Sequence, residues 1–324
     1  MAAELRDDWE DALDKDIRAA AREMRPRDIR VLVDHYYALQ DLRLQVQGKV
    51  REAKQGRDEG AVFVVSAMFA RQVGLEQDIK GALAAWVKAQ VDPSPTAWAA
   101  RQVGIGPVIA AALAAHLPGT ERVMDAEQPD QAARIAALSD GVRMREGWER
   151  TRMVDKEGEI LEGWVRPRSV PPTVGHWWRF AGLDPTLVWG KGEVRPWNAK
   201  LKVVCYKIGE SFVKVSGNEN AFYGQLYAER KAWELAKDAD GGNADAAAAA
   251  LAKPTRWSDN QRKAYESGHL PPAQLHRRAT RWVAKLYLAH YHEAAYLAEY
   301  GTMPPKPYVL EHVPGHVHAI RRPE

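Results

Sequence analysis

Apolar residues recur every three or four positions over the beginning of the chain, which is the period of a helix with one apolar face. Residues 4–24 predict one amphipathic helix, which Pro26 ends, and Asp28 can cap the helix that follows. In that second helix a seam alternates steps of three and four residues, as in a coiled coil, with Arg43 as its only polar member. The seam consists of Ile29, Leu32, Tyr36, Leu39, Arg43, Val46 and Val50.

A third helix is predicted over about 61–91, where it would fold back on the second as a helical hairpin. Its seam includes Met68, Leu75, Ile79 and Trp86. Residues 1–92 hold 15 basic and 17 acidic residues, so this segment suits assembly better than contact with a polyanion. We expect residues 28–91 to join copies of the chain into a homo-oligomer. The alternative is that these helices pack only on their own chain.

A second unit is expected to begin at Pro93, because Asp92-Pro93-Ser94-Pro95 breaks the preceding helix. Within residues 93–141, short helices at 96–103 and 107–116 flank a glycine turn, which is a helix-hairpin-helix pattern. Glycines allow a tight turn, and the backbone N–H groups at the start of the second helix suit a phosphate. The predicted contacts are the amides of Gly104, Ile105, Gly106 and Val108. The alternative is a tight turn between helices that binds no ligand.

Residues 142–324 are predicted as a basic helical region, with helices at 177–181, 198–210, 218–235 and 274–300. Two alternating runs around a D-x-x-G turn predict a small β-hairpin at about 148–165. A low-complexity, alanine-rich stretch at about 237–252 is predicted as a mobile insertion. The predicted fold class is therefore mainly α: a helical hairpin or coiled coil, followed by a helix-hairpin-helix-containing helical domain with a small β-hairpin.

Composition excludes several classes of protein. The single cysteine, Cys205, rules out a disulfide framework and a cysteine-based zinc cluster, and it suits a reducing cytoplasm. The longest apolar run, 61–70, is too short to span a bilayer, so no membrane partner is expected. The sequence has no P-loop, dinucleotide-binding or serine-hydrolase motif. We therefore predict no cofactor, no metal site and no catalytic residue.

Basic charge is concentrated in one part of a chain whose net charge is only +3. Residues 164–214 hold nine bases and three acids, interleaved with tryptophans, a mixture that suits a phosphate backbone with unpaired bases. The candidate nucleic-acid contacts are Arg179, Lys191, Arg195, Lys200, Lys202 and Lys207, joined by Arg277, Arg278 and Arg281 of the last helix. Trp189 and Trp197 are the candidates for stacking on bases. The alternative is a basic face that only contacts solvent.

The order of these motifs resembles the C-terminal half of a family of insertion-sequence transposases. Those enzymes are guided by a bridge RNA and pair a RuvC-like DEDD domain with a helix-hairpin-helix domain. The motifs are Gly104-Ile-Gly-Pro-Val, Phe180-Ala-Gly-Leu-Asp-Pro, the basic helix at 198–210, Phe222-Tyr-Gly-Gln-Leu and the arginine-rich helix from Arg277. The resemblance covers residues 28–300, and it implies that 28–91 correspond to the coiled-coil linker of that family.

The chain departs from the family pattern in two places. The family's N-terminal domain, with its four metal-binding acids, has no counterpart, since residues 1–27 are predicted as helix. Trp189 stands where the family has its nucleophilic serine, and the next serine is Ser211. The resemblance therefore implies a nucleic-acid-binding surface without strand-cutting chemistry.

The sequence thus predicts a protein that binds DNA or structured RNA and resembles the non-catalytic half of a transposase. An alternative from the enzyme class is a recombinase that works with a partner supplying the acids, or that uses Ser211 or Ser216. An alternative from the structural class is an assembly protein that kept the fold and lost the ligand.

Overall fold

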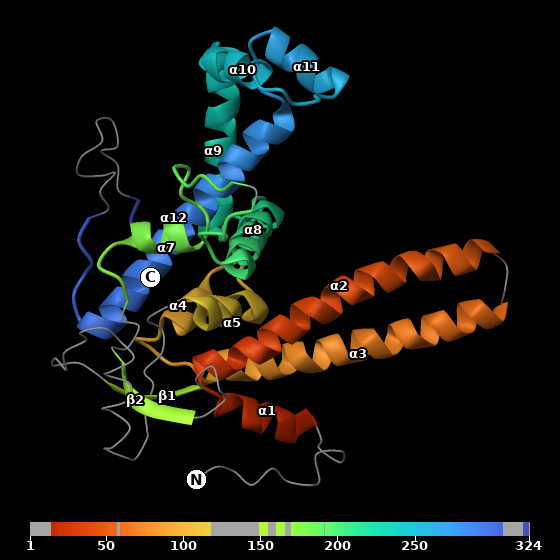
Figure 1. The fold of residues 1–324 in the computed structure, drawn as a ribbon, viewed down its shortest axis with the longest axis vertical. Helices are drawn as coiled ribbons and strands as arrows, with labels where there is room; N and C mark the ends of the chain where they lie inside the picture. The colour runs from red at the N-terminus through yellow and green to blue at the C-terminus, as the bar shows by residue number, and fades with distance from the viewer. Residues whose placement is uncertain are drawn as a thin grey trace. The chain divides into compact units, whose positions relative to one another are not determined.

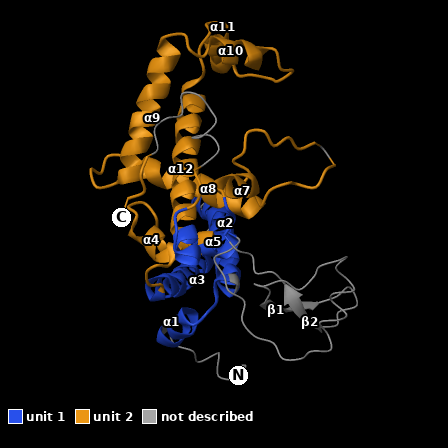
Figure 2. Cartoon of the chain, turned by 90° about the vertical axis from the view of Figure 1, so that its left-hand side faces the viewer, with its two compact units in different colours: residues 1–89, 114–172, 295–303 blue, residues 90–113, 173–294, 304–324 orange. Residues whose placement is uncertain are grey.

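The computed structural model describes residues 14–56, 59–117, 149–154, 160–165, 170–190, 192–306 and 320–323. Within these residues the chain forms eleven helices and one pair of strands, so the protein is mainly helical, as predicted (Figure 1). It divides into two compact units (Figure 2). Unit 1 comprises 1–89, 114–172 and 295–303, and unit 2 comprises 90–113, 173–294 and 304–324. The predicted boundary near residue 92 lies close to the first break, but the described part of the predicted second unit, residues 93–117, is divided between the two units.

Unit 1 is built on three helices: α1 (Asp14–Arg22), α2 (Pro26–Gly56) and α3 (Glu59–Ala89). Helices α2 and α3 lie side by side as the predicted hairpin (Figure 1). Its buried end holds Ile29, Leu83 and Trp86, whose indole Nε1 donates to the Met24 carbonyl at 2.8 Å. The N-terminal part of the helix predicted over 4–24 lies outside the described residues.

The one polar member of the predicted seam has a partner on the facing helix. Arg43 Nε donates to Glu76 Oε2 at 2.5 Å, and Glu76 is buried. Glu76 also contributes, after burial, to raising the pKa of Tyr36 on the same seam. A paired charge inside an otherwise apolar seam fixes the register of the two helices, because any slip would leave a buried charge unpaired.

Replacing Arg43 by methionine is expected to destabilise unit 1 by about 3 kcal/mol, because it leaves the buried Glu76 carboxylate without its cation. Glu76→Gln is expected to cost less, since Arg43 is the more exposed partner and reaches water. Urea unfolding of the two variants measures the difference. Equal losses would contradict the argument that the unequal burial of the two partners decides the cost.

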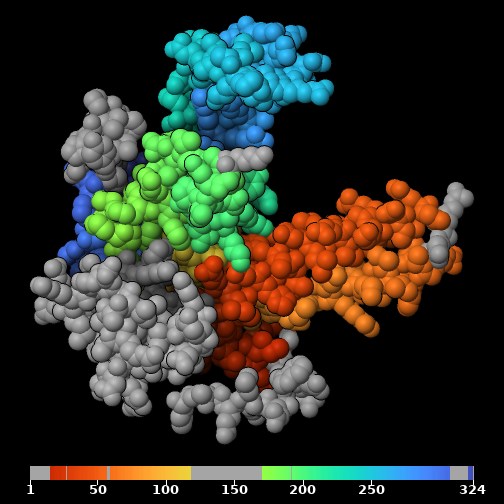
Figure 3. Space-filling view, in the orientation of Figure 1, coloured from red at the N-terminus to blue at the C-terminus, as the bar shows by residue number. Residues whose placement is uncertain are grey.

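The far end of the hairpin is open to solvent (Figure 3). Phe63 is 74% exposed and Met68 59%, and Leu75 is exposed as well. The predicted places of Met68 and Leu75 on the seam are therefore wrong, whereas Ile79 and Trp86 are buried. A heptad pattern selects apolar positions but does not say which of them face the partner helix. The self-association expected of residues 28–91 stays a prediction.

Unit 1 also contains the strands β1 (Glu149–Val154) and β2 (Ile160–Val165). They pair antiparallel, with Glu149 opposite Val165 and Val154 opposite Ile160. The β-hairpin was predicted at about 148–165, and its turn lies outside the described residues.

Unit 2 contains the remaining helices, apart from the last residues of α12, which belong to unit 1. They are α4 (Pro95–Arg101), α5 (Pro107–His116), whose last residues belong to unit 1, α7 (Val174–Phe180), α8 (Ala199–Lys214), α9 (Phe222–Ala239), α10 (Ala244–Leu251), α11 (Asp259–Glu266) and α12 (Pro272–Tyr300). Local capping begins three of them: Ser94 accepts from the Thr96 N–H, Asn198 from the Leu201 N–H, and Ser258 forms a capping box with Gln261.

The core of unit 2 forms around α12. Its buried residues Tyr287 and Tyr291 are enclosed by aromatic rings from four other helices. Trp98 of α4 stacks on Tyr287 at 5.6 Å, Trp177 of α7 lies 5.8 Å from Tyr291, and Phe212 of α8 and Tyr223 of α9 contact Tyr287 at 5.3 and 5.1 Å. Many of the tryptophans and tyrosines thus pack the core, and α12 holds a fixed position relative to α8 and α9.

The alanine-rich stretch predicted as a mobile insertion at about 237–252 instead ends α9 and forms α10. Alanine has the highest helix propensity, and Ala247 is fully buried against Tyr265, Leu270 and Leu275. Low complexity here reflects a helix that packs closely rather than a segment without structure.

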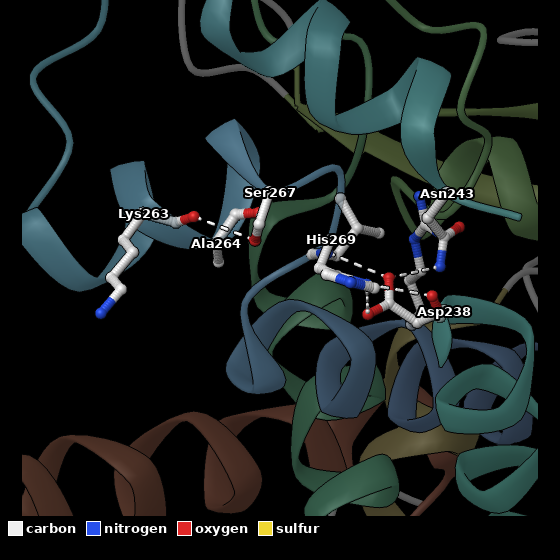
Figure 4. A network of polar contacts seen from close by, with 8 residues as sticks. Asp238, Asn243, Lys263, Ala264, Ser267 and His269 are labelled. Carbon is white, nitrogen blue, oxygen red and sulfur yellow. Dashed lines mark hydrogen bonds and ion pairs between the residues drawn. The ribbon is translucent and has the colours of Figure 1, made fainter. Parts of the chain in front are cut away.

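A polar network fixes α10 and α11 to the ends of α9 and α12 (Figure 4). Asp238 Oδ1 accepts from the Leu270 N–H at 3.0 Å and from Asn243 Nδ2 at 2.9 Å. His269 Nδ1 lies 3.2 Å from Asp238 Oδ2. Asn243 in turn accepts from Arg278 Nη1 at 2.8 Å, so the network holds a predicted contact residue of α12 in place. None of the helices in the described residues is both long and apolar enough to cross a membrane.

Candidate nucleic-acid interface

The turn between α4 and α5 packs against the end of α8. Gly104 has a φ of +100°, and a Cβ there would lie 3.1 Å from the Phe212 ring. Its carbonyl accepts a hydrogen bond from the Ser211 hydroxyl. The side chains of Ile105 and Val108 are buried. Two structural needs, a left-handed backbone and a close approach to α8, therefore account for Gly104.

The structure modifies the predicted set of phosphate-binding amides. The Ile105 N–H donates to the Gln102 carbonyl at 2.9 Å, so the turn itself uses it, and the prediction for Ile105 is wrong. The N–H groups of Gly106 and Val108 have no backbone acceptor among the described residues, and Gly106 is exposed. The base that directly precedes this turn, Arg101, pairs with Asp92 at 2.8 Å, and the candidate basic contacts lie on other elements of unit 2.

Gly104→Ala is expected to lower the free energy of unfolding by about 1–3 kcal/mol, because alanine resists a positive φ. Gly106→Ala should cost less than about 1 kcal/mol, since nothing lies within 4 Å of a Cβ there and only a helix cap weakens. Chemical denaturation of both variants makes the comparison. Equal losses would contradict the packing of this turn on α8.

The predicted stacking residues lie in a segment that we call the tryptophan loop, residues 187–190 and 192–197. The rings of Trp189 and Trp197 meet edge to face at 6.0 Å. Arg195 lies over Trp189 at 5.1 Å, and Lys202 of α8 lies over Trp197 at 4.2 Å. Trp197 packs closely on Gly182, where the φ is +65° and a Cβ would lie 2.8 Å from the ring. The structure thus joins four of the predicted residues in one cluster.

The other bases predicted in this region are more dispersed. Arg179 is exposed, and its Nη1 lies 3.9 Å from Asp184 Oδ2. Two hydrogen bonds from Thr186, followed by the charge of Arg179, lower the pKa of Asp184. Lys200 and Lys207 lie on α8, the first exposed and the second half-buried. Lys191 lies outside the described residues.

A groove of about 500 Å³ runs between α9 and α12, which lie side by side (Figures 1 and 2). We call it the α9–α12 groove. Its lining holds six bases, one acid and two tryptophans. The bases are Arg230, Lys237, Arg277, Arg278, Arg281 and Lys285, the acid is Glu234, and the tryptophans are Trp233 and Trp282. The three arginines predicted on α12, Arg277, Arg278 and Arg281, thus line one groove together with residues of α9.

The buried carboxylate of Glu234 organises the floor of the groove. It accepts from Arg230 Nη2 at 2.7 Å and lies 3.6 Å from Arg278 Nη1. Arg230 in turn lies over the ring of Trp233 at 4.1 Å and over that of Trp282 at 5.4 Å. These contacts hold two arginines and two indoles in fixed positions, so the wall of the groove is preorganised.

Arg281 connects the groove with the tryptophan loop. Burial first, and then the charges of Arg281 and Arg195, lower the pKa of Lys202. Burial also lowers the pKa of Lys285, where Asp184 opposes the shift and Arg281 adds to it. Lys285 Nζ lies over the ring of Trp178 at 4.3 Å. The positive charges of this group therefore repel one another, and a bound anion would reduce that repulsion. The group consists of Arg195, Lys202, Arg281 and Lys285.

Among the basic and aromatic residues of the groove, the sequence analysis missed four: Arg230, Trp233 and Lys237 of α9, and Trp282 of α12. The first three are three and four residues apart, which places them on one face of a helix. The same spacing rule selects Arg278, Arg281 and Lys285 on α12. Applied to α9, it would have found the second wall of the groove.

Searches of protein-family models, curated proteins and solved structures find no match to this chain. Among the described residues, no group of three or more histidine, cysteine, aspartate or glutamate side chains could hold a metal ion. The functional argument therefore rests on the geometry and charge of the groove.

Proposed function

We propose that this protein binds nucleic acid through the α9–α12 groove and the adjoining tryptophan loop. One observation carries the proposal: two helices distant in sequence bring six bases, a single acid and two tryptophans into one groove. Lysine and arginine neutralise phosphates, and their release of counterions supplies most of the affinity of a sequence-independent site. Tryptophan rings add a surface on which bases stack.

Among the described residues, carboxylates cancel only part of the charge in the groove. Glu234 is engaged with Arg230 and Arg278. The other four bases, Lys237, Arg277, Arg281 and Lys285, have no carboxylate within 4.0 Å among the described residues. A basic face that served only solubility would not need to be concave, lined with indoles and braced by a buried carboxylate. This arrangement favours binding over the solvent-exposed alternative.

We further propose that the chain acts as the non-catalytic half of a transposase-like protein, as its motifs imply. The hydroxyls of the two serines considered for a recombinase already donate to backbone carbonyls: Ser211 to Gly104, and Ser216 to Val213 at 2.8 Å. A nucleophilic serine needs a nearby general base, whereas these hydroxyls close a turn and a helix end. This supports binding without cleavage over the recombinase alternative.

The test is a binding titration of the whole chain against a duplex DNA, a single-stranded DNA and a structured RNA hairpin, at several salt concentrations. We expect binding that weakens as salt rises, with a slope of about −3 in a plot of the logarithm of the association constant against the logarithm of the salt concentration, if four bases contact phosphates of a single strand. If none of the three nucleic acids binds at low salt, the proposal is overturned.

A further inference from the structure

We propose that the α9–α12 groove takes a single strand of nucleic acid and stacks an unpaired base on Trp233. This inference rests on the proposed function and narrows its ligand from nucleic acid in general to an unpaired segment. The class of ligand is a polynucleotide with accessible base faces. The experiment below compares a deoxyribose strand with a ribose strand and so determines which sugar is preferred.

The first argument is the state of Trp233. Trp233 lines the groove and is nevertheless 49% exposed. Arg230 lies over the ring at 4.1 Å and is itself held by Glu234, and Lys237 Nζ lies over the ring at 5.4 Å, so the indole is fixed beside two cations while half of the residue remains exposed. A fixed, accessible indole beside cations is a stacking platform for a base. Paired bases stack on each other inside a duplex and expose only their edges, so a duplex leaves this ring unused.

The second argument is the row of cations on α12. Arg277, Arg281 and Lys285 are four residues apart, which corresponds to a rise of about 6 Å per step along a helix. Steps of four residues stay on one helix face, so the three cations form a row along one wall. Lys237 of α9 lines the same groove. A row of this kind follows the successive phosphates of one strand.

The third argument is the size of the groove. A volume of about 500 Å³ is in the range of sites that enclose one small molecule, and it suits a nucleotide and its neighbouring phosphate. The walls are braced: Arg278 is held by Asn243 at 2.8 Å and by Glu234 at 3.6 Å. The groove is thus prepared to take a strand into its interior, whereas a duplex would contact only its rim.

The experiment measures the affinity of the full chain for a 20-residue oligothymidine, the matching oligouridine and a 20-base-pair DNA duplex. The variants are Trp233→Ala, Trp233→Phe and Lys231→Glu. Lys231 is exposed on the same helix and lies outside the lining, so it controls for general charge effects. Circular dichroism and thermal melting check that each variant folds. Trp233→Phe keeps an aromatic ring at this position, so it separates the loss of stacking from a loss of packing.

We expect the single strands to bind about tenfold tighter than the duplex. Trp233→Ala should weaken their binding about tenfold, and Trp233→Phe should restore most of it. Duplex binding should change less than about twofold. A preference for either sugar supports the inference, provided that the preferred single strand binds more tightly than the duplex.

Two results separate this inference from the proposed function. Equal affinity for strand and duplex, or single-strand binding that Trp233→Ala leaves unchanged, would overturn the inference, while salt-sensitive binding would preserve the proposed function. Absence of binding to every probe would overturn both.

Discussion

Reversing the charges of Arg277 and Arg281 together is expected to weaken nucleic-acid binding at least about a hundredfold at low salt. Both residues are exposed on α12 and line the α9–α12 groove, and no described carboxylate pairs with either. The double variant removes two cations and adds two anions where the phosphates would lie. Each lost phosphate contact also lowers the salt slope by about one, so the slope should fall by about two.

The controls for this variant come from the same surface. Arg277→Lys with Arg281→Lys keeps the charge and should retain most of the affinity. Lys231→Glu makes half the charge change of the double Glu variant, on α9 outside the groove, and should cost less than about threefold at moderate salt. Arg278 is unsuitable, because its pairing with Glu234 and Asn243 makes any change structural as well as electrostatic. Unaltered binding by the double Glu variant would place the interface elsewhere.

Gly209→Val is expected to destabilise unit 2 by about 3 kcal/mol. Gly209 lies within α8 and is buried where this helix crosses α12. A Cβ at this position would lie 2.5 Å from Thr280 Cγ2 and 3.0 Å from the Thr280 carbonyl oxygen. The carbonyl cannot move away without shifting α12, so the two helices would have to separate.

The same substitution should also weaken binding, because a shift of Thr280 would displace Arg281, which follows it on α12 and lines the groove. The matched control is Gly74→Ala in the exposed interior of α3, where nothing lies within 4 Å of a Cβ. That change should stabilise the protein by about 0.5–1 kcal/mol. Melting temperatures of the two variants give the comparison. A Gly209→Val variant that melts like the wild type would contradict the close crossing of α8 and α12.

The sequence predicted the long helices well because each carries its own signal. The helix predicted over 61–91 forms as Glu59–Ala89, and the one predicted over 274–300 forms as Pro272–Tyr300. Periodicity along one chain is local information, and it does not depend on the rest of the fold. The burial of residues at the far end of the hairpin was not predictable in this way. The exposure of Met68, for example, depends on what α3 packs against.

The candidate site was predictable only in part. The trio Arg277, Arg278 and Arg281 was found from its spacing, but its partner wall on α9 was not, since a groove arises only when two distant helices pack together. The turn at Gly104 shows the opposite error. Its backbone amides were interpreted as phosphate ligands, but the Ile105 amide is used within the turn, and the predictions for Gly104, Gly106 and Val108 stay predictions. The Ile105 hydrogen bond is local to the turn, whereas the hydrogen bond from the Ser211 hydroxyl to the Gly104 carbonyl depends on the packing of α8.

The most direct test of the central claim is to map where nucleic acid touches the protein. Photocrosslinking of the full chain to an iodouridine-containing oligonucleotide, followed by mass spectrometry of the peptides, reports the contact residues. We expect adducts in peptides from 222–239, 272–300 and the tryptophan loop, and their loss in the Arg277→Glu, Arg281→Glu variant. Adducts confined to the α4–α5 turn or to the α2–α3 hairpin would contradict the assignment of the groove as the binding site.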